Sequence, residues 1–229
     1  MTEQLFLTDA YTQEAPAHVT EHTTEGGLVL NESVFYATGG GQPGDTGRLS
    51  WSDGAGEYDL PIITTVKGEA GRIVLIPAEG QPLPAVGQEV VQTLDWDRRF
   101  GHMRVHTALH LLSVVIPLPV SGGSIGAEKG RLDFNMPEAP EDKQALEDAL
   151  NTLIAGDLTV SERWITEDEL DANPDLVKTM SVAPPRGTGR IRLVRIGSAD
   201  EQIDLQPCGG THVRSTAEIG PIRLGKVEK

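Results

Sequence analysis

The only cysteine of this 229-residue chain, Cys208, lies four positions before His212 in the stretch QPCGGTHV. A cysteine thiolate and a histidine imidazole are ligands that favour zinc over magnesium or calcium. Gly209 and Gly210 between them allow a non-helical loop to turn both side chains toward one point. Because a single cysteine cannot form an internal disulfide, we also expect a reducing, cytoplasmic environment.

Three histidines, His102, His106 and His110, are spaced four residues apart in a segment with a helical pattern. On a helix, residues four apart share one face with Cβ atoms about 5–6 Å apart, which suits two ligands of one ion. This face continues into apolar positions and so points inward, where metal ligation satisfies an otherwise costly imidazole. The residues thus predict a zinc site that combines helical histidines with Cys208 and His212. The alternative is a buried free cysteine among hydrogen-bonded core histidines.

The two other histidines, His18 and His22, have the same spacing in a different setting. Their segment has the pattern of a β-strand, in which four residues span about 13 Å. We therefore expect both side chains at the surface and outside the metal site.

The charge of the chain is distributed unevenly. The formal net charge of −15 argues against a nucleic-acid partner for the chain as a whole, because phosphate binding normally requires a basic surface. Residues 1–92, however, hold 13 acidic and only 3 basic side chains, so most of the acidic excess lies there. Two later arginine clusters are candidate phosphate contacts, with solvated surface charge as the alternative: Arg98, Arg99 and Arg104, and Arg186, Arg190, Arg192 and Arg195.

Residues 1–94 have the pattern of a small β domain. Six short segments rich in Val, Ile, Leu and Thr are separated by Gly, Pro and Asp turns, which favours a small barrel or sandwich. The stretch ATGGGQPGDTG, residues 37–47, lies among them and lacks the Gly-Lys-Ser/Thr of a phosphate-binding P-loop. Its glycines indicate either tight turns or a close approach of the backbone to a ligand.

Residues 95–229 combine helices with strands. Helices are expected over 97–116 and 140–156, and Thr166 with Glu169 forms a capping box that starts a short third helix. Strands are expected over residues 130–136, 158–165, 190–197, 202–207 and 219–228. The longest apolar run, Leu111–Val120, contains two prolines and is too short to span a membrane. The sequence therefore predicts an α+β fold: a β-barrel-like domain over 1–94, then a two-layer domain over 95–229 with helices on an antiparallel sheet.

Five motifs, in this order along the chain, resemble one known family. GGGQPGDTG, RVHTALHLL, KGRLDF, CGGTHV and EIGPIRLGKV are similar to the alanyl-tRNA editing proteins of the AlaX kind and to the editing domain of alanyl-tRNA synthetase. The resemblance covers nearly the whole chain. It implies a trans-acting deacylase that hydrolyses the ester of serine, with glycine as a second candidate, wrongly attached to tRNA(Ala).

The resemblance also implies roles for particular residues. The zinc ligands would be His106, His110, Cys208 and His212. His102, one turn before this motif, and Thr107 within it are the candidate catalytic groups beside a zinc-associated water. The substrate hydroxyl would be sensed by Ser121, Ser124 or Thr211, with the Thr107 hydroxyl as a further candidate.

The expected tRNA contacts are the glycine-rich loop and selected arginines, namely Gly39, Gly40, Gly41, Gln42, Arg98, Arg99, Arg186 and Arg190. Two alternatives from other functional classes stay open. One is a non-catalytic tRNA-binding module with a structural zinc. The other is a zinc hydrolase of small esters, for which the arginine clusters would be irrelevant.

Overall fold

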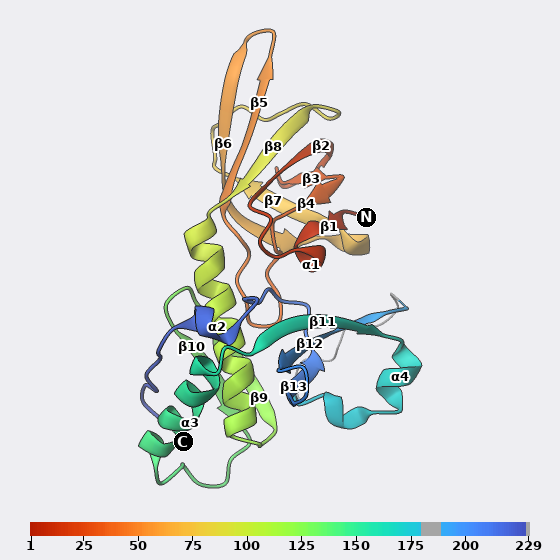
Figure 1. Cartoon of the computed structure of the whole chain (residues 1–229). Helices are drawn as coiled ribbons and strands as arrows, with labels where there is room; N and C mark the ends of the chain where they lie inside the picture. The colour runs from red at the N-terminus through yellow and green to blue at the C-terminus, as the bar shows by residue number, and fades with distance from the viewer. Residues whose placement is uncertain (180–188, 228–229) are drawn as a thin grey trace. The chain divides into compact units, whose positions relative to one another are not determined.

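The computed structural model describes residues 1–179 and 189–227 of the chain (Figure 1). The chain divides into two compact units, Met1–Gly101 and His102–Lys229. The boundary falls inside helix α2 (Trp96–Val115), whereas we predicted it between residues 94 and 95, just before this helix. The first turn of the helix belongs to the first unit because Arg99, in that turn, is bound by residues of the β domain.

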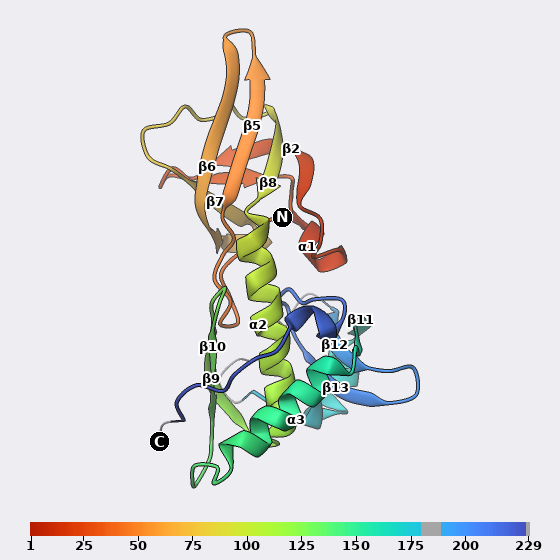
Figure 2. The same ribbon diagram turned by 60° about the vertical axis from the view of Figure 1, so that its left-hand side comes forward.

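The first unit is built on a closed antiparallel barrel with the strand order β2-β3-β7-β6-β5-β8. Its strands are β2 (Glu14–His22), β3 (Leu28–Leu30), β5 (Gly47–Asp53), β6 (Gly56–Lys67), β7 (Ile73–Pro77) and β8 (Glu89–Leu94). All six predicted β segments contribute to this barrel, so the prediction of a barrel-like domain is confirmed. The β5–β6 hairpin extends beyond the other strands of the unit in both views (Figures 1 and 2).

The barrel interior follows from the alternation of side chains along each strand. In β8, for example, Val90, Gln92 and Leu94 are buried while the residues between them are partly exposed. Leu49 and Leu60 of the neighbouring hairpin join the same apolar cluster. Short additional elements precede or link these strands: β1 (Glu3–Gln4), α1 (Leu5–Thr8), β4 (Glu32–Ser33), which pairs in parallel with β1, and the 3-10 turn η1 (Glu69–Gly71).

The second unit contains most of helix α2 and an antiparallel sheet with the order β11-β12-β13. Its strands are β11 (Thr159–Ile165), β12 (Ile191–Gly197) and β13 (Gln202–Pro207), and its helices after α2 are α3 (Lys143–Ala155) and α4 (Glu167–Asp171). The predicted capping box is present, because the Thr166 hydroxyl accepts a hydrogen bond from the Glu169 amide and the Glu169 carboxylate accepts one from the Thr166 amide. Two 3-10 turns, η2 (Pro174–Leu176) and η3 (Thr216–Ile219), complete the unit.

The segment after helix α2 contains a strand that we did not predict. Strand β9 (Val120–Ile125) pairs antiparallel with β10 (Gly130–Phe134), and β10 lies within the strand predicted over residues 130–136. The close approach of β10 explains the glycine at position 123 of this strand. A Cβ atom there would lie 2.9 Å from the Arg131 carbonyl oxygen on β10, so the hairpin tolerates only glycine without a shift.

The predicted strand over 219–228 is wrong. Its described residues, up to 227, contain no strand, and they run alongside helix α3 (Figure 2). Side chains of α3 take the place of a neighbouring strand. Asn151 exchanges two hydrogen bonds with the backbone of Ile222, and Glu147 accepts one from the Leu224 amide.

Candidate metal centre

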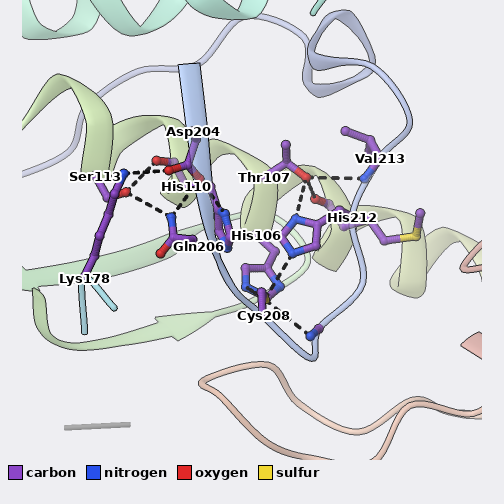
Figure 3. Close-up of polar contacts among 12 residues, drawn as sticks. His106, Thr107, His110, Ser113, Lys178, Asp204, Gln206, Cys208, His212 and Val213 are labelled. Carbon is purple, nitrogen blue, oxygen red and sulfur yellow. Dashed lines mark hydrogen bonds and ion pairs between the residues drawn. The ribbon is translucent and has the colours of Figure 1, made fainter. Parts of the chain in front are cut away.

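Four side chains of the second unit point toward one another (Figure 3). His106 and His110 lie one turn apart on helix α2, and Cys208 and His212 lie on the loop after β13. One ligand atom from each residue lies within 4.8 Å of all the others. The Cys208 Sγ atom is 3.5 Å from Nε2 of His106 and 3.3 Å from Nε2 of His212.

The two sulfur–nitrogen distances fit a single tetrahedral ion. With metal–sulfur and metal–nitrogen bonds of zinc-like length, sulfur and nitrogen ligands are separated by about 3.5 Å. The three imidazole rings are also packed against one another, with the His212 ring centroid 4.2 Å from that of His106 and 4.5 Å from that of His110. The arrangement therefore brings together the four residues that the sequence suggested, and a metal can be held by them.

The imidazole of His110 is fixed from behind by a buried carboxylate. Its Nδ1 atom lies 3.0 Å from Oδ2 of Asp204, whose other oxygen is 2.6 Å from the Lys178 ammonium. Gln206 Nε2 donates a second hydrogen bond to Asp204 Oδ2, at 2.8 Å. With Nδ1–H held by Asp204, the Nε2 lone pair of His110 is the one available to a metal.

The contact with Asp204 also shapes the pKa values of both groups, and in the metal-free protein it favours a protonated His110 whose Nε2 proton a metal ion would displace. Burial disfavours the charged imidazole, but the hydrogen bond to Asp204 and the neighbouring Cys208 outweigh burial and raise the pKa of His110 to about 9. Burial likewise disfavours the carboxylate, but His110 and Lys178 hold the pKa of Asp204 below its usual range. Asp204 is therefore an anion that partners the ligand rather than a proton donor.

The imidazole of His212 is oriented by Thr107. The Thr107 hydroxyl lies 3.1 Å from Nδ1 of His212, donates to the Met103 carbonyl at 2.8 Å and accepts from the Val213 amide at 3.3 Å. With Nε2 of His212 directed at the metal, Nδ1 keeps the ring proton and donates it to this hydroxyl. One donor and two acceptor positions of the hydroxyl are then all in use.

This saturation changes the assignment of Thr107. We predicted it as a catalytic candidate or as a sensor of a substrate hydroxyl. Its side chain is instead fully buried, and its hydroxyl is occupied by three protein partners. Thr107 thus orients a candidate ligand and has no position left for substrate.

The thiol of Cys208 lies among imidazole rings. Burial alone would raise its pKa, but the charges of His106 and His212 lower the pKa of Cys208 well below its usual value. The Gly210 amide, 3.4 Å from Sγ, donates a further hydrogen bond. A thiolate, the form that binds metal, is therefore the favoured state.

The other predicted site residues lie outside this cluster of ligand atoms. His102 is buried on α2, one turn before His106. Ser121 and Ser124 are exposed on strand β9, and Thr211 is fully buried next to His212 in the sequence. His18 and His22 lie exposed on β2, in a strand as expected.

The glycine-rich loop is a compact turn of the first unit. Gly39 and Gln42 exchange two backbone hydrogen bonds of 3.0 Å, and between them Gly40 and Gly41 have positive φ angles of 58° and 81°. The left-handed conformation at two successive positions explains the two glycines. Gln42 is buried, so within this loop Gly40 and Gly41 are the more exposed positions.

The structure does not support the predicted contact between Arg99 and tRNA. This arginine is fully buried, forms an ion pair with Asp45 and donates to the carbonyls of Val34, at 2.6 Å, and Ala10, at 3.0 Å. Its charge is compensated inside the first unit, where it anchors helix α2 to the end of the glycine-rich loop. Arg98 and Arg190 are partly or fully exposed, and the predicted contact at Arg186 lies outside the described residues.

Sequence reasoning missed the residues behind the ligands, Asp204, Gln206, Lys178 and Arg192. One signal was present: in QIDLQPC, Asp204, Gln206 and Cys208 alternate with other residues and so share one face of a strand. No comparable signal connects Lys178 or Arg192 to the site, because their partners are chosen by the tertiary fold.

Comparison with known proteins gives two kinds of match. Residues 191–229, which include β12, β13 and the Cys208–His212 loop, match the family profile "Threonyl and Alanyl tRNA synthetase second additional domain". The whole chain is 31% identical to the alanyl-tRNA editing protein AlaX-M of Methanosarcina acetivorans over 235 residues, or 94% of that protein. The corresponding protein of Methanosarcina barkeri is also 31% identical, again over 94% of its length.

The whole chain also matches part of much longer enzymes. It is 36% identical over 238 residues to the alanine–tRNA ligase of Pyrobaculum arsenaticum, of which it spans 25%. The chain thus covers about a quarter of these ligases and nearly all of the editing proteins. Among the described residues, no helix combines the length and apolar character needed to cross a membrane.

Proposed function

The chain belongs to the family of the alanyl-tRNA editing protein AlaX-M, and we propose that it is a trans-editing hydrolase that removes serine from misacylated tRNA(Ala). Glycine is the second candidate amino acid, and the cytoplasm is the proposed location. The observation that carries the proposal is the convergence of His106, His110, Cys208 and His212 on one point of the second unit.

We propose zinc as the metal, because three imidazoles and one thiolate are a donor set that zinc favours. When bound, it would supply Lewis-acid chemistry to an aminoacyl ester, which is already an activated substrate. The residues of this chain hold and orient it: Asp204 fixes the ring of His110, and Thr107 fixes that of His212. With Thr107 engaged in this way, His102 is the candidate that stays for proton transfer.

Serine differs from alanine by one hydroxyl group, so a selective site must form favourable contacts with that hydroxyl. Ser121, Ser124 and Thr211 are the proposed sensors, because each carries a hydroxyl close in sequence to the ligand-bearing elements. A site whose polar groups require the substrate hydroxyl rejects alanine strongly, since alanine leaves those groups unpaired.

Phosphates of the tRNA are the proposed partners of Arg98, Arg190 and the glycine-rich loop. Lys67 of strand β6 is a further candidate, because its ammonium group lies next to this loop. A Cβ atom placed on Gly39 would be only 2.7 Å from Nζ of Lys67. Glycine at position 39 therefore leaves room for an ammonium group over the loop. Lys67 forms no ion pair with any described carboxylate, whereas Arg48 and Arg72 of the same unit do.

One observation favours a second candidate function. Four protein donors complete a tetrahedral shell, which is typical of structural sites, whereas catalytic zinc usually keeps one position open. The alternative is a tRNA-binding module in which the metal only supports the fold. Catalytic use of the ion requires that the shell expand or that one ligand withdraw.

The experiment that separates the two follows serine released from charged tRNA(Ala) by substoichiometric protein. The proposed enzyme releases many equivalents of serine per chain, and Cys208→Ala or His110→Ala abolishes both turnover and bound zinc. His22→Ala, an exposed histidine of the barrel, is the matched control and should change neither. Tight tRNA binding without turnover would instead establish the non-catalytic module.

A further inference from the structure

Arg192 stands out among the described arginines of the second unit because it is buried. It lies on β12, the central strand of the three-stranded sheet, and only 6% of its surface is exposed. We predicted it as part of a basic cluster for phosphate. Its guanidinium is instead directed at the loop that carries Cys208, and its charge is paired with Glu162 of β11.

Arg192 contacts both ends of the Cys208–Gly210 segment, which we call the ligand loop. Nη1 donates to the Cys208 carbonyl at 2.9 Å and to the Gly210 carbonyl at 2.8 Å, while Nη2 pairs with Glu162. The Arg192 carbonyl also accepts a hydrogen bond of 3.1 Å from the Cys208 amide. Three hydrogen bonds thus join this one residue to the loop between Cys208 and Gly210.

The bonds to both carbonyls define the direction of the loop. Because the carbonyls of Cys208 and Gly210 both turn toward Nη1, the peptide groups between them are held in one orientation. In that orientation the Gly210 amide donates to Sγ at 3.4 Å, and Sγ faces Nε2 of His106 and of His212. The side chain needs several donors in a planar, rigid group for this task, which arginine supplies and lysine does not.

We propose that Arg192 is a positioning residue that holds the Cys208–Gly210 loop in its metal-binding conformation before the metal arrives. This inference rests on the proposed metal site. It predicts that Arg192 sets metal affinity and thiolate geometry, although the residue does not itself reach the ligand atoms. If Arg192 served only packing or folding, metal affinity and thiolate geometry would be unchanged in any variant that folds.

The test compares the unmodified protein with Arg192→Met and Arg192→Lys. Zinc affinity is measured by competition with a chelator, and Co²⁺ is then bound in place of zinc to record the thiolate-to-cobalt charge-transfer band. We expect Arg192→Met to bind zinc about 10–100-fold more weakly, the range typical when a supporting contact of a metal ligand is lost. Its charge-transfer band should be weaker per bound cobalt, and Arg192→Lys should recover part of both losses.

Arg195→Met is the matched control. Arg195 lies on the same strand and also donates to backbone carbonyls, those of Ser198 and Glu201, but these belong to the β12–β13 turn and not to the ligand loop. Its zinc affinity and cobalt band should equal those of the unmodified protein. If Arg192→Met does not fold, as judged by its circular dichroism, Arg192→Lys carries the comparison.

The outcomes separate the inference from the proposed function. Unchanged zinc affinity and an unchanged cobalt band in folded Arg192 variants would overturn the positioning role while leaving the metal site intact. Failure of the unmodified protein to bind zinc or cobalt through Cys208 would overturn the proposed metal site itself.

Discussion

The Nδ1 atom of His110 lies 3.0 Å from Oδ2 of Asp204, and this contact decides which ring nitrogen faces the other candidate ligands. Asp204 is buried and is itself compensated by the Lys178 ammonium. Asp204 thus provides a fixed hydrogen-bond acceptor for the Nδ1–H group of His110. This leaves Nε2 of His110 for the metal.

Replacing Asp204 should weaken metal binding without removing a ligand. We expect Asp204→Ala to lower zinc affinity by about 10–100-fold, because His110 loses the partner that fixes its ring and its tautomer. Asp204→Asn retains an acceptor oxygen and should lose less. Asp200→Ala, an exposed aspartate of the β12–β13 turn, serves as the control. Equal chelator-competition curves for all three variants would contradict the role given to Asp204.

Thr107→Val tests the orientation of His212. Valine has nearly the same shape, so the helix should persist while the acceptor for Nδ1–H is lost. We expect zinc affinity to fall by about tenfold or more. Thr152→Val is a close control, because the Thr152 hydroxyl also donates to the carbonyl four residues earlier in its helix, that of Asp148, but it contacts no candidate ligand. A Thr107 variant that binds zinc like the Thr152 variant would remove this residue from the account.

The lowered pKa of Cys208 predicts a reactive thiolate in the metal-free protein. Alkylation by iodoacetamide requires the thiolate, so its rate should stay nearly constant from about pH 9 down to about pH 7. Urea-unfolded protein is the internal reference, because Cys208 is the only cysteine, and its rate should fall about tenfold per pH unit below the pKa of an ordinary thiol. Zinc should suppress the reaction of the folded protein. Parallel pH profiles for the folded and unfolded chains would contradict the shift.

The proposed phosphate contacts can be read from the salt dependence of tRNA binding. Lys67→Gln, Arg98→Gln and Arg190→Gln should each reduce the slope of log affinity against log salt by about 0.7–0.9, the contribution of one phosphate contact. Arg48→Gln is the control, since Arg48 is exposed on the same barrel but lies 3.6 Å from Asp59. An unchanged slope for any one of the three variants would exclude that side chain from the tRNA interface.

Selectivity and metal binding should depend on different hydroxyl groups. Replacing the true serine sensor, by Ser121→Ala, Ser124→Ala or Thr211→Val, should narrow the serine-to-alanine ratio of deacylation while zinc stays bound. Thr107→Val should instead lower zinc affinity. We would abandon these sensors if all three variants retained the full ratio.

The sequence predicted the elements with strong local signals. The barrel strands were recognisable because β-branched residues alternate along them and turns separate them, and the ligand histidines because four-residue spacing on a helix places side chains together. The segment after Ile219 was misread as a strand because its composition is strand-like, whereas its backbone partners are the side chains of Asn151 and Glu147. Local pattern does not reveal which partner satisfies a backbone.

The same limit explains the residues behind the candidate ligands. Arg192 and Arg99 look like members of basic clusters, and only the fold shows that Glu162 and Asp45 neutralise them. Asp204 lies 94 residues from His110 along the chain, so their contact could not be inferred from spacing.

The most direct measurement of the central claim compares tRNA(Ala) charged with serine and with alanine. Each is incubated with the same small amount of zinc-loaded protein, and the initial rates of amino-acid release are corrected for spontaneous hydrolysis. We predict rapid release of serine and negligible release of alanine, with a ratio approaching about 10⁴, beyond the roughly 10–200-fold that an apolar pocket achieves. Comparable rates for the two tRNAs would contradict the editing assignment and identify a general aminoacyl-ester hydrolase.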